Sequence, residues 1–231
     1  MKTSWQGVVA LARREGIVPG PYLDSRGIWT CFIGHTRAAG APDPARLPRG
    51  RMPNLDEAIE EAVNVFVRDL AKYEARVNKA LKVTVKQHEF DAMVSFDFNT
   101  GAIHKAEFVK ALNAGDRDKA ARQMMNWRKP PEVISRREEE QAQFRDGTVS
   151  NKGVPVWDVR ENGRVIFKPI RTVSPTELAR LARPSADEIA VPASRPKTTT
   201  TQKVVGLGYL LAAISATIAA FFDKIKDWLG G

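Results

Sequence analysis

The sequence contains few residues that could bind a metal or form a covalent cross-link. Its 231 residues include one cysteine and three histidines. One cysteine excludes an intramolecular disulfide, and three scattered histidines do not supply the ligand set of a metal site. The sequence also lacks a glycine-rich phosphate-binding loop and a dinucleotide-binding fingerprint. We therefore expect no bound metal and no cofactor.

Positive charge is in excess, yet the motifs of nucleic-acid-binding proteins are absent. The 36 lysines and arginines outnumber the 27 acidic residues and give a net charge of +9. Such a balance favours anionic polymers or lipid headgroups as partners. Because there is no zinc-ligand cluster, aromatic RNA-binding strand or recognition-helix motif, we expect no nucleic-acid partner. Residues 1–16 lack the long apolar segment of a signal peptide, so export by the classical N-terminal route is not expected.

Two carboxylates and a hydroxyl stand close together near the N-terminus, at Glu15, Asp24 and Thr30. Helical spacing of apolar residues predicts a helix from Trp5 to Glu15, with Glu15 beside the apolar stripe. Partial desolvation at this helix end favours the neutral form of a carboxyl group and raises its pKa. Glu15 is therefore the better candidate for a general acid.

Asp24 has different surroundings, because it begins the polar turn of residues 24–27. The segment Ile28–Ile33 is rich in β-branched and aromatic residues and predicts a strand that carries Thr30, whose hydroxyl could hold a water for Asp24. Cleavage of a glycosidic bond requires two carboxyl groups that differ in protonation at one pH. The spacing alone also fits an ordinary helix-surface acid and a turn residue.

The sequence around these residues resembles that of the phage-type lysozymes, the endolysins and muramidases of glycoside hydrolase family 24. Their shared pattern, similar to E-G-x7-D-x2-G-x2-T-x3-G-H-T, is present here as Glu15-Gly16, Asp24, Gly27, Thr30 and Gly34-His35-Thr36. Further similar segments follow in the same order at 67–81, 90–102, 108–116 and 135–144. The resemblance covers about residues 5–147.

The resemblance implies hydrolysis of the β-1,4 bond between N-acetylmuramic acid and N-acetylglucosamine in bacterial peptidoglycan, with inversion of configuration. Matched residue by residue, Glu15 is expected to be the general acid, Asp24 the base for the attacking water and Thr30 the hydroxyl that positions this water. A lytic transglycosylase is the enzymatic alternative. A second alternative is a non-catalytic peptidoglycan-binding or virion structural protein on the same fold. A third is a membrane-disrupting protein.

Four further residues are expected to support this site. The resemblance implies that His35 pairs with Asp69 in a stabilising ion pair, and that Asn99 contacts the substrate. An amide suits N-acetyl sugars because it both donates and accepts hydrogen bonds. Arg137, like Arg136, is expected either to pair with acidic neighbours in its own helix or to hold the wall of the active site. The sequence departs from many relatives at residues 31–33, where the bulky Cys31-Phe32-Ile33 fills the strand. Cys31 is expected to be a buried core thiol.

The predicted fold is α+β with two lobes. Residues 1–147 are expected to form a lysozyme-like domain, in which a small β lobe and a mainly helical lobe are joined by a long helix over Leu55–Leu81 with Asn54 as its N-cap. Residues 148–173 predict a β-hairpin extension that turns at Asn162-Gly163. A Pro/Ser/Thr-rich linker over 174–203, with one short helix near its start, follows.

The C-terminal part contains a long uncharged segment. Residues 204–222 are long enough to span a bilayer as a helix, and residues 223–231 form a short polar tail. We expect this hydrophobic tail helix to associate with the bacterial inner membrane, with action of the enzyme in the periplasm and a possible dependence on a holin. A buried core helix is the alternative for this segment.

Overall fold

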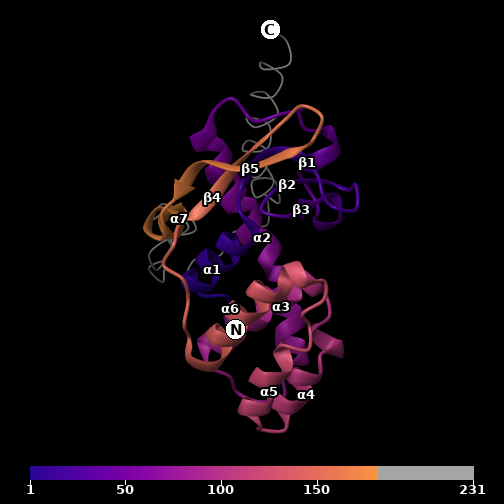
Figure 1. Cartoon of the computed structure of the whole chain (residues 1–231), viewed down its shortest axis with the longest axis vertical. Coiled ribbons are helices and arrows are strands. Elements are labelled where there is room, and N and C mark those ends of the chain that lie inside the picture. Colours follow the sequence, from indigo (N-terminus) through magenta and orange to yellow (C-terminus); the bar gives the residue numbers. More distant parts are fainter. Residues whose placement is uncertain (182–231) are drawn as a thin grey trace, which may run out of the picture. The chain divides into compact units, whose positions relative to one another are not determined.

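The computed structural model describes residues 1–181. The chain divides into one unit from Met1 to Ile189 and a second from Ala190 to Gly231, and every described residue belongs to the first. The sheets lie towards one end of this unit and helices α3 to α6 towards the other, with α1 and α2 between them (Figure 1). The α+β class and the two-lobed plan predicted from the sequence are confirmed.

The small lobe begins with a helix and continues as an antiparallel sheet. Helix α1 spans Trp5–Glu15, and the sheet has the order β1 (Val18–Leu23), β2 (Trp29–Phe32), β3 (His35–Thr36). The Ser4 hydroxyl caps α1 by accepting a hydrogen bond from the Gly7 N–H at 3.1 Å. The predicted bounds of α1 are those observed.

A long helix joins the two lobes. After the short 3₁₀ turns η1 (Arg37–Ala39) and η2 (Pro44–Arg46), α2 runs from Leu55 to Ala80. Its predicted N-cap, Asn54, accepts hydrogen bonds from the backbone of the first turn. Ile59, Val63, Phe66 and Leu70 form a buried apolar stripe, and α2 contacts both the small sheet and α3. One helix therefore contributes to the cores of both lobes.

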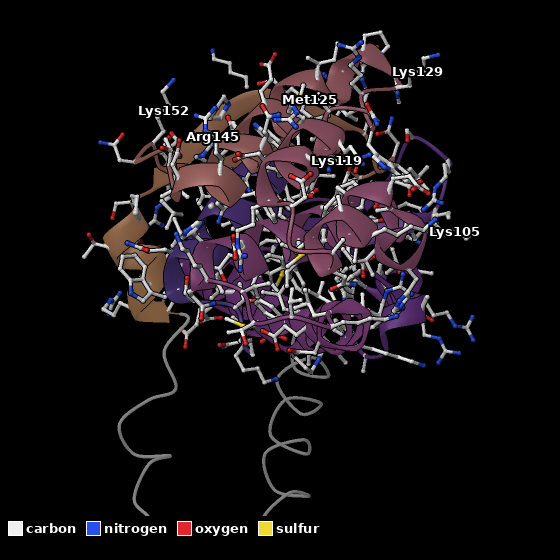
Figure 2. All side chains as sticks on the ribbon, turned by 90° about the horizontal axis from the view of Figure 1, so that it is seen from below. Lys105, Lys119, Met125, Lys129, Arg145 and Lys152 are labelled. Carbon is white, nitrogen blue, oxygen red and sulfur yellow. The ribbon has the colours of Figure 1, made fainter. Side chains whose placement is uncertain are left out.

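The helical lobe consists of four helices and two short 3₁₀ turns. Its elements are α3 (Gln87–Thr100), η3 (Ile103–Lys105), α4 (Glu107–Asn113), α5 (Arg117–Met124), η4 (Pro131–Val133) and α6 (Ile134–Asp146). The middle of α3 is buried on all sides, and its main partner is α6. Seen from the end of this lobe, basic side chains such as Lys105, Lys119 and Lys129 project outward (Figure 2). Their amino groups contribute to the positive charge of the surface.

The predicted hairpin is present as a separate two-stranded sheet. Strand β4 (Val154–Val159) pairs antiparallel with β5 (Val165–Val173), and Gly163 adopts a positive φ of 82° in the turn. The hairpin does not stand apart from the lysozyme-like region, because β4 packs on β1 and α1. A parallel bridge joins Ile17 to Val156.

The short helix expected near the start of the linker is α7, Pro175–Leu181, but it packs against α1 and α2 and buries Leu178 completely. Residues 174–181 therefore belong to the folded unit, which corrects the predicted start of the linker at residue 174. Between residues 1 and 181, no helix is both long and apolar enough to cross a membrane. The predicted membrane helix at 204–222, the polar tail and the rest of the linker lie outside the described residues.

Candidate active site

Glu15 is the last residue of α1 and lies at the junction of the two lobes. Its side chain is 20% exposed, so the expected partial desolvation is present. The Arg136 guanidinium from α6 donates a hydrogen bond to Glu15 Oε1 and another to the Arg14 carbonyl oxygen at 3.2 Å. A charged hydrogen bond of this kind fixes the orientation of the carboxyl group. The contact links the end of α1 in the small lobe to the first turns of α6 in the helical lobe.

Asp24 is held by the turn that it begins. Its Oδ1 accepts hydrogen bonds from the backbone N–H groups of Arg26 and Ile28, both at 2.8 Å. The Arg26 guanidinium lies 3.7 Å from Oδ2, and the carboxyl group is 22% exposed. One oxygen is thus occupied by backbone donors, and the other is free of backbone hydrogen bonds.

Thr30 lies in the middle of β2 and is buried. Its hydroxyl donates to the Ile28 carbonyl oxygen at 3.1 Å. Thr30 pairs with Tyr22 of β1 on one side and with Thr36 of β3 on the other. Directly opposed residues share a face of an antiparallel sheet, so these three side chains lie on one face.

Tyr22 is a member of this site that the sequence did not indicate. Burial raises the pKa of its phenol, and the nearby charges of Glu15 and Asp24 raise it further. Both candidate carboxylates therefore act electrostatically on one hydroxyl. The phenol stays protonated at neutral pH, so it is a hydrogen-bond donor close to both carboxyl groups.

The bulky residues 31–33 point into the core. Cys31, Phe32 and Ile33 are all buried there. Burial raises the pKa of the Cys31 thiol, and the charges of Asp69 and Glu61 act in the same direction. A thiol that resists ionisation is a poor nucleophile. The departure from the family pattern thus adds volume to the core and not to the surface at the junction of the lobes.

His35 and Asp69 are brought together as expected. The Nδ1 atom of His35 lies 2.6 Å from Asp69 Oδ2, and Nε2 lies 2.8 Å from the Pro42 carbonyl oxygen. Both neighbours are hydrogen-bond acceptors, so the arrangement suits the doubly protonated ring. Burial by itself lowers the pKa of His35, but the hydrogen bonds to Asp69 and Pro42 outweigh it and the pKa is raised.

Asn99 and Arg137 contact one another at the end of α3. Arg137 donates to Asn99 Oδ1 at 2.5 Å and also forms an ion pair with Glu140 three residues further along α6. The Arg137 and Glu140 side chains are completely buried, whereas Asn99 is exposed. The intrahelical pairing expected for Arg137 is present. The sequence did not reveal that its neighbour Arg136 pairs with Glu15 instead, because 121 residues separate the two.

A hollow of about 200 Å³ lies where the small lobe meets α2 and α3. It is lined by Gly34, Thr36, Ala38, Ala39, Arg68, Asp69, Lys72, Tyr73 and Phe98. Thr36 shares its sheet face with Thr30, and Phe98 directly precedes Asn99. The hollow lies at the junction of the lobes, and Asp69 is the one candidate residue in its lining, which does not include Glu15, Asp24 or Thr30. A larger hollow of about 640 Å³ lies beside the hairpin turn and contains none of the candidate residues.

No group of three His, Cys, Asp or Glu side chains between residues 1 and 181 is arranged to hold a metal ion. The chemistry available at the site is that of carboxyl and hydroxyl groups. Glu15, Asp24 and Thr30 lie on three consecutive segments: the end of a helix, a turn and a strand. Both carboxyl groups act electrostatically on Tyr22, which pairs with Thr30 across the sheet, so the three segments meet beside Tyr22.

Comparisons with known proteins show which family the chain resembles. The sequence profile of the family described as phage lysozyme matches residues 12–140. The chain is 31% identical over 157 residues to an endolysin of Acyrthosiphon pisum secondary endosymbiont phage 1, a match that covers 62% of this chain and 98% of the relative. It is 32% identical over 120 residues to a SAR-endolysin of Escherichia phage Mu, covering 51% of this chain and 63% of the relative.

Among solved structures, an endolysin from Escherichia coli O157:H7 phage FAHEc1 superposes with a TM-score of 0.57 at 30% identity, covering 65% of this chain and 97% of that structure. The fold is that of the phage lysozymes. The chain belongs to the phage lysozyme family. It is a glycoside hydrolase that hydrolyses peptidoglycan in host cell lysis.

Proposed function

We propose that Glu15 and Asp24 catalyse a single inverting displacement at the anomeric carbon of N-acetylmuramic acid. Glu15 protonates the oxygen that leaves with N-acetylglucosamine, and Asp24 takes a proton from the water that attacks the opposite face of the sugar. The bond from the anomeric carbon to the leaving oxygen breaks as the bond to water forms. Thr30 holds this water through its hydroxyl oxygen, which keeps acceptor capacity while its proton is donated to Ile28.

The observation that carries this proposal is the difference between the surroundings of the two carboxyl groups. The two groups are about equally exposed, at 20% and 22%, but Glu15 ends a helix and is oriented by Arg136 of the other lobe. Asp24 receives two backbone N–H donors and lies in a polar turn. Two carboxyl groups in unlike surroundings are the usual basis for an acid role and a base role at one pH.

The products of digested peptidoglycan test these roles. Glu15→Gln and Asp24→Asn should each lower the rate by about 100-fold or more, because each removes a proton-transfer group. The matched control is Glu107→Gln, which changes an exposed carboxyl group of the helical lobe that pairs with Lys110. It should keep the wild-type rate.

The stereochemistry and end groups of the products separate the alternatives. Inversion of a β bond gives the α anomer first, which NMR detects before the anomers equilibrate. Anhydro-muramyl ends would mean a lytic transglycosylase. Absence of products from the wild-type protein would favour the alternative of a non-catalytic peptidoglycan-binding or virion structural protein.

We further propose that Asn99 binds an N-acetyl group of the glycan. Its Oδ1 is held by Arg137, and the side chain is exposed beside the hollow between the lobes. An amide fixed in this way presents its N–H₂ group in a constant direction. Asn99→Ala should raise KM more than it lowers kcat. An unchanged KM would exclude this contact.

We also propose that residues 204–222 tether the enzyme to the inner membrane and that it acts in the periplasm. The support is a segment of nineteen residues without a charge, together with the SAR-endolysin among its relatives. Protease protection in spheroplasts and membrane fractionation test the tether, with and without a holin. A chain that stays in the soluble fraction, with or without the residues after Lys203, would overturn it.

A further inference from the structure

The hairpin β4–β5 contacts the segment between the two candidate carboxylates at both of its ends. Near Glu15, the Ile17 N–H donates to the Pro155 carbonyl oxygen, and the Trp157 N–H donates to the Ile17 carbonyl oxygen, both at 2.9 Å. Near Asp24, the Leu23 N–H donates to the Gly163 carbonyl oxygen at 2.9 Å. The hairpin follows residue 140, where the match to the family profile ends.

The segment between Glu15 and Asp24 makes few regular hydrogen bonds within its own sheet. Strand β1 contains Pro19 and Pro21, which have no N–H to donate. Its pairing with β2 is irregular between Val18 and Pro21. A strand with missing donors and a register shift depends on contacts from other elements for its position.

Trp157 lies directly against the residue that follows Glu15. A Cβ atom on Gly16 would lie 2.4 Å from the Trp157 ring, so no side chain fits there. Gly16 also has a positive φ of 72° and ends α1. The indole ring therefore contacts the backbone immediately after the candidate acid.

The turn of the hairpin packs equally closely against the end of the segment that precedes Asp24. A Cβ on Gly163 would lie 2.9 Å from the Trp29 ring and 3.2 Å from Leu23. Trp29 is covered on one face by the Arg49 guanidinium, 3.6 Å from the ring centre. The turn of the hairpin is thus seated beside the residue that precedes Asp24.

We propose that the hairpin is a positioning element of the active site, with Trp157 as the residue that sets the place of Glu15. This inference rests on the proposed roles of Glu15 and Asp24. The hairpin fixes the separation of the two carboxyl groups by holding Ile17 and Leu23 at once. Trp157 touches no substrate and acts through the backbone of Gly16.

The test compares three full-length variants in steady-state hydrolysis of purified peptidoglycan. Trp157→Ala should lower kcat by about tenfold or more with KM within about twofold, since small misplacements of catalytic groups are costly. Trp157→Phe keeps a ring against Gly16 and should recover most of kcat. Leu178→Ala is the control, because it removes a buried side chain of α7, outside the hairpin. It should lower the Tm yet keep the wild-type kcat well below that Tm.

Amide hydrogen exchange gives a readout that does not depend on activity. In Trp157→Ala, the N–H groups of Ile17 and Leu23 should exchange faster than in Leu178→Ala, and the alkaline limb of the pH–rate profile should shift because Glu15 is the proposed acid. The inference is overturned if kcat is unchanged, or if its loss follows Tm equally in the Trp157 and Leu178 variants. If Glu15→Gln stays active, the proposed function fails, while faster exchange at Ile17 would still show the role of the hairpin in holding the segment.

Discussion

Two neighbouring arginines of α6 form ion pairs in very different surroundings. Arg136 contacts Glu15, whose side chain is 20% exposed at the junction of the lobes. Arg137 contacts Glu140, and neither side chain has any exposure. The first pair joins two lobes through residues far apart in the sequence, and the second lies within one helix turn. Similar ion pairs thus lie at the proposed active site and in the core of the helical lobe.

The buried pair is part of a larger polar network in the helical lobe. Glu140 accepts a hydrogen bond from the Ser95 hydroxyl at 2.6 Å. Arg14 donates to the same hydroxyl oxygen at 3.1 Å and to Gln143 at 2.9 Å. Arg14 directly precedes Glu15, so the network and Arg136 both hold the end of α1. Removing a residue of the buried network should therefore mainly lower stability. Removing Arg136 should mainly lower activity.

The largest expected effect is on stability, from Glu140→Ala. It leaves the Arg137 charge buried without its carboxylate partner, so we expect a loss of about 3–5 kcal/mol in the free energy of unfolding. Urea denaturation measures this loss. A loss below about 1 kcal/mol would mean that water reaches Arg137 and that the pair is not structural.

Asp69→Asn should give the next largest loss, with a distinctive dependence on pH. Since the pKa of His35 is raised in the folded protein, its pairing with Asp69 adds stability below the ordinary value of 6.5, and this contribution is lost as pH rises through the folded pKa. At pH 5 we expect the variant to lose about 2–3 kcal/mol. Unfolding curves measured from pH 5 to 9 should show that the free energy of unfolding depends less on pH in Asp69→Asn than in the wild type. An unchanged slope would assign the pH dependence to another group.

Arg136→Met should act mainly on activity. It removes the guanidinium that orients Glu15 while keeping an unbranched side chain, so we expect kcat to fall about tenfold, equivalent to about 1.4 kcal/mol. The pH–rate profile should change on the alkaline limb, because activity falls as the proposed acid loses its proton and the surroundings of that acid change. Arg145→Met is a suitable control, since Arg145 pairs with its neighbour Asp146 on the surface. Equal losses in both variants would mean a general effect of charge on substrate binding.

These contrasts also explain which features were predictable from the sequence. The ends of α1, the Asn54 cap of α2 and the Asn162-Gly163 turn depend on residues within a few positions of each other, and local patterns identify them. The pairing of His35 with Asp69 came only from the family resemblance. The contacts from Arg136 to Glu15 and from Trp157 to Gly16 leave no periodic signal. The packing of α7 was missed because a short polar helix near proline resembles a linker.

The smallest expected effect comes from Cys31→Ala, which sharpens the difference between core and site. Cys31 neighbours Thr30 in β2 but lies on the opposite face, and its thiol is buried and resists ionisation. Loss of one sulfur atom from the core should cost about 1 kcal/mol and leave kcat unchanged. Thermal unfolding and the hydrolysis assay check the two parts of this prediction. A large fall in kcat at unchanged Tm would place the thiol in the reaction, because packing on the core face alone does not alter chemistry on the face that carries Thr30.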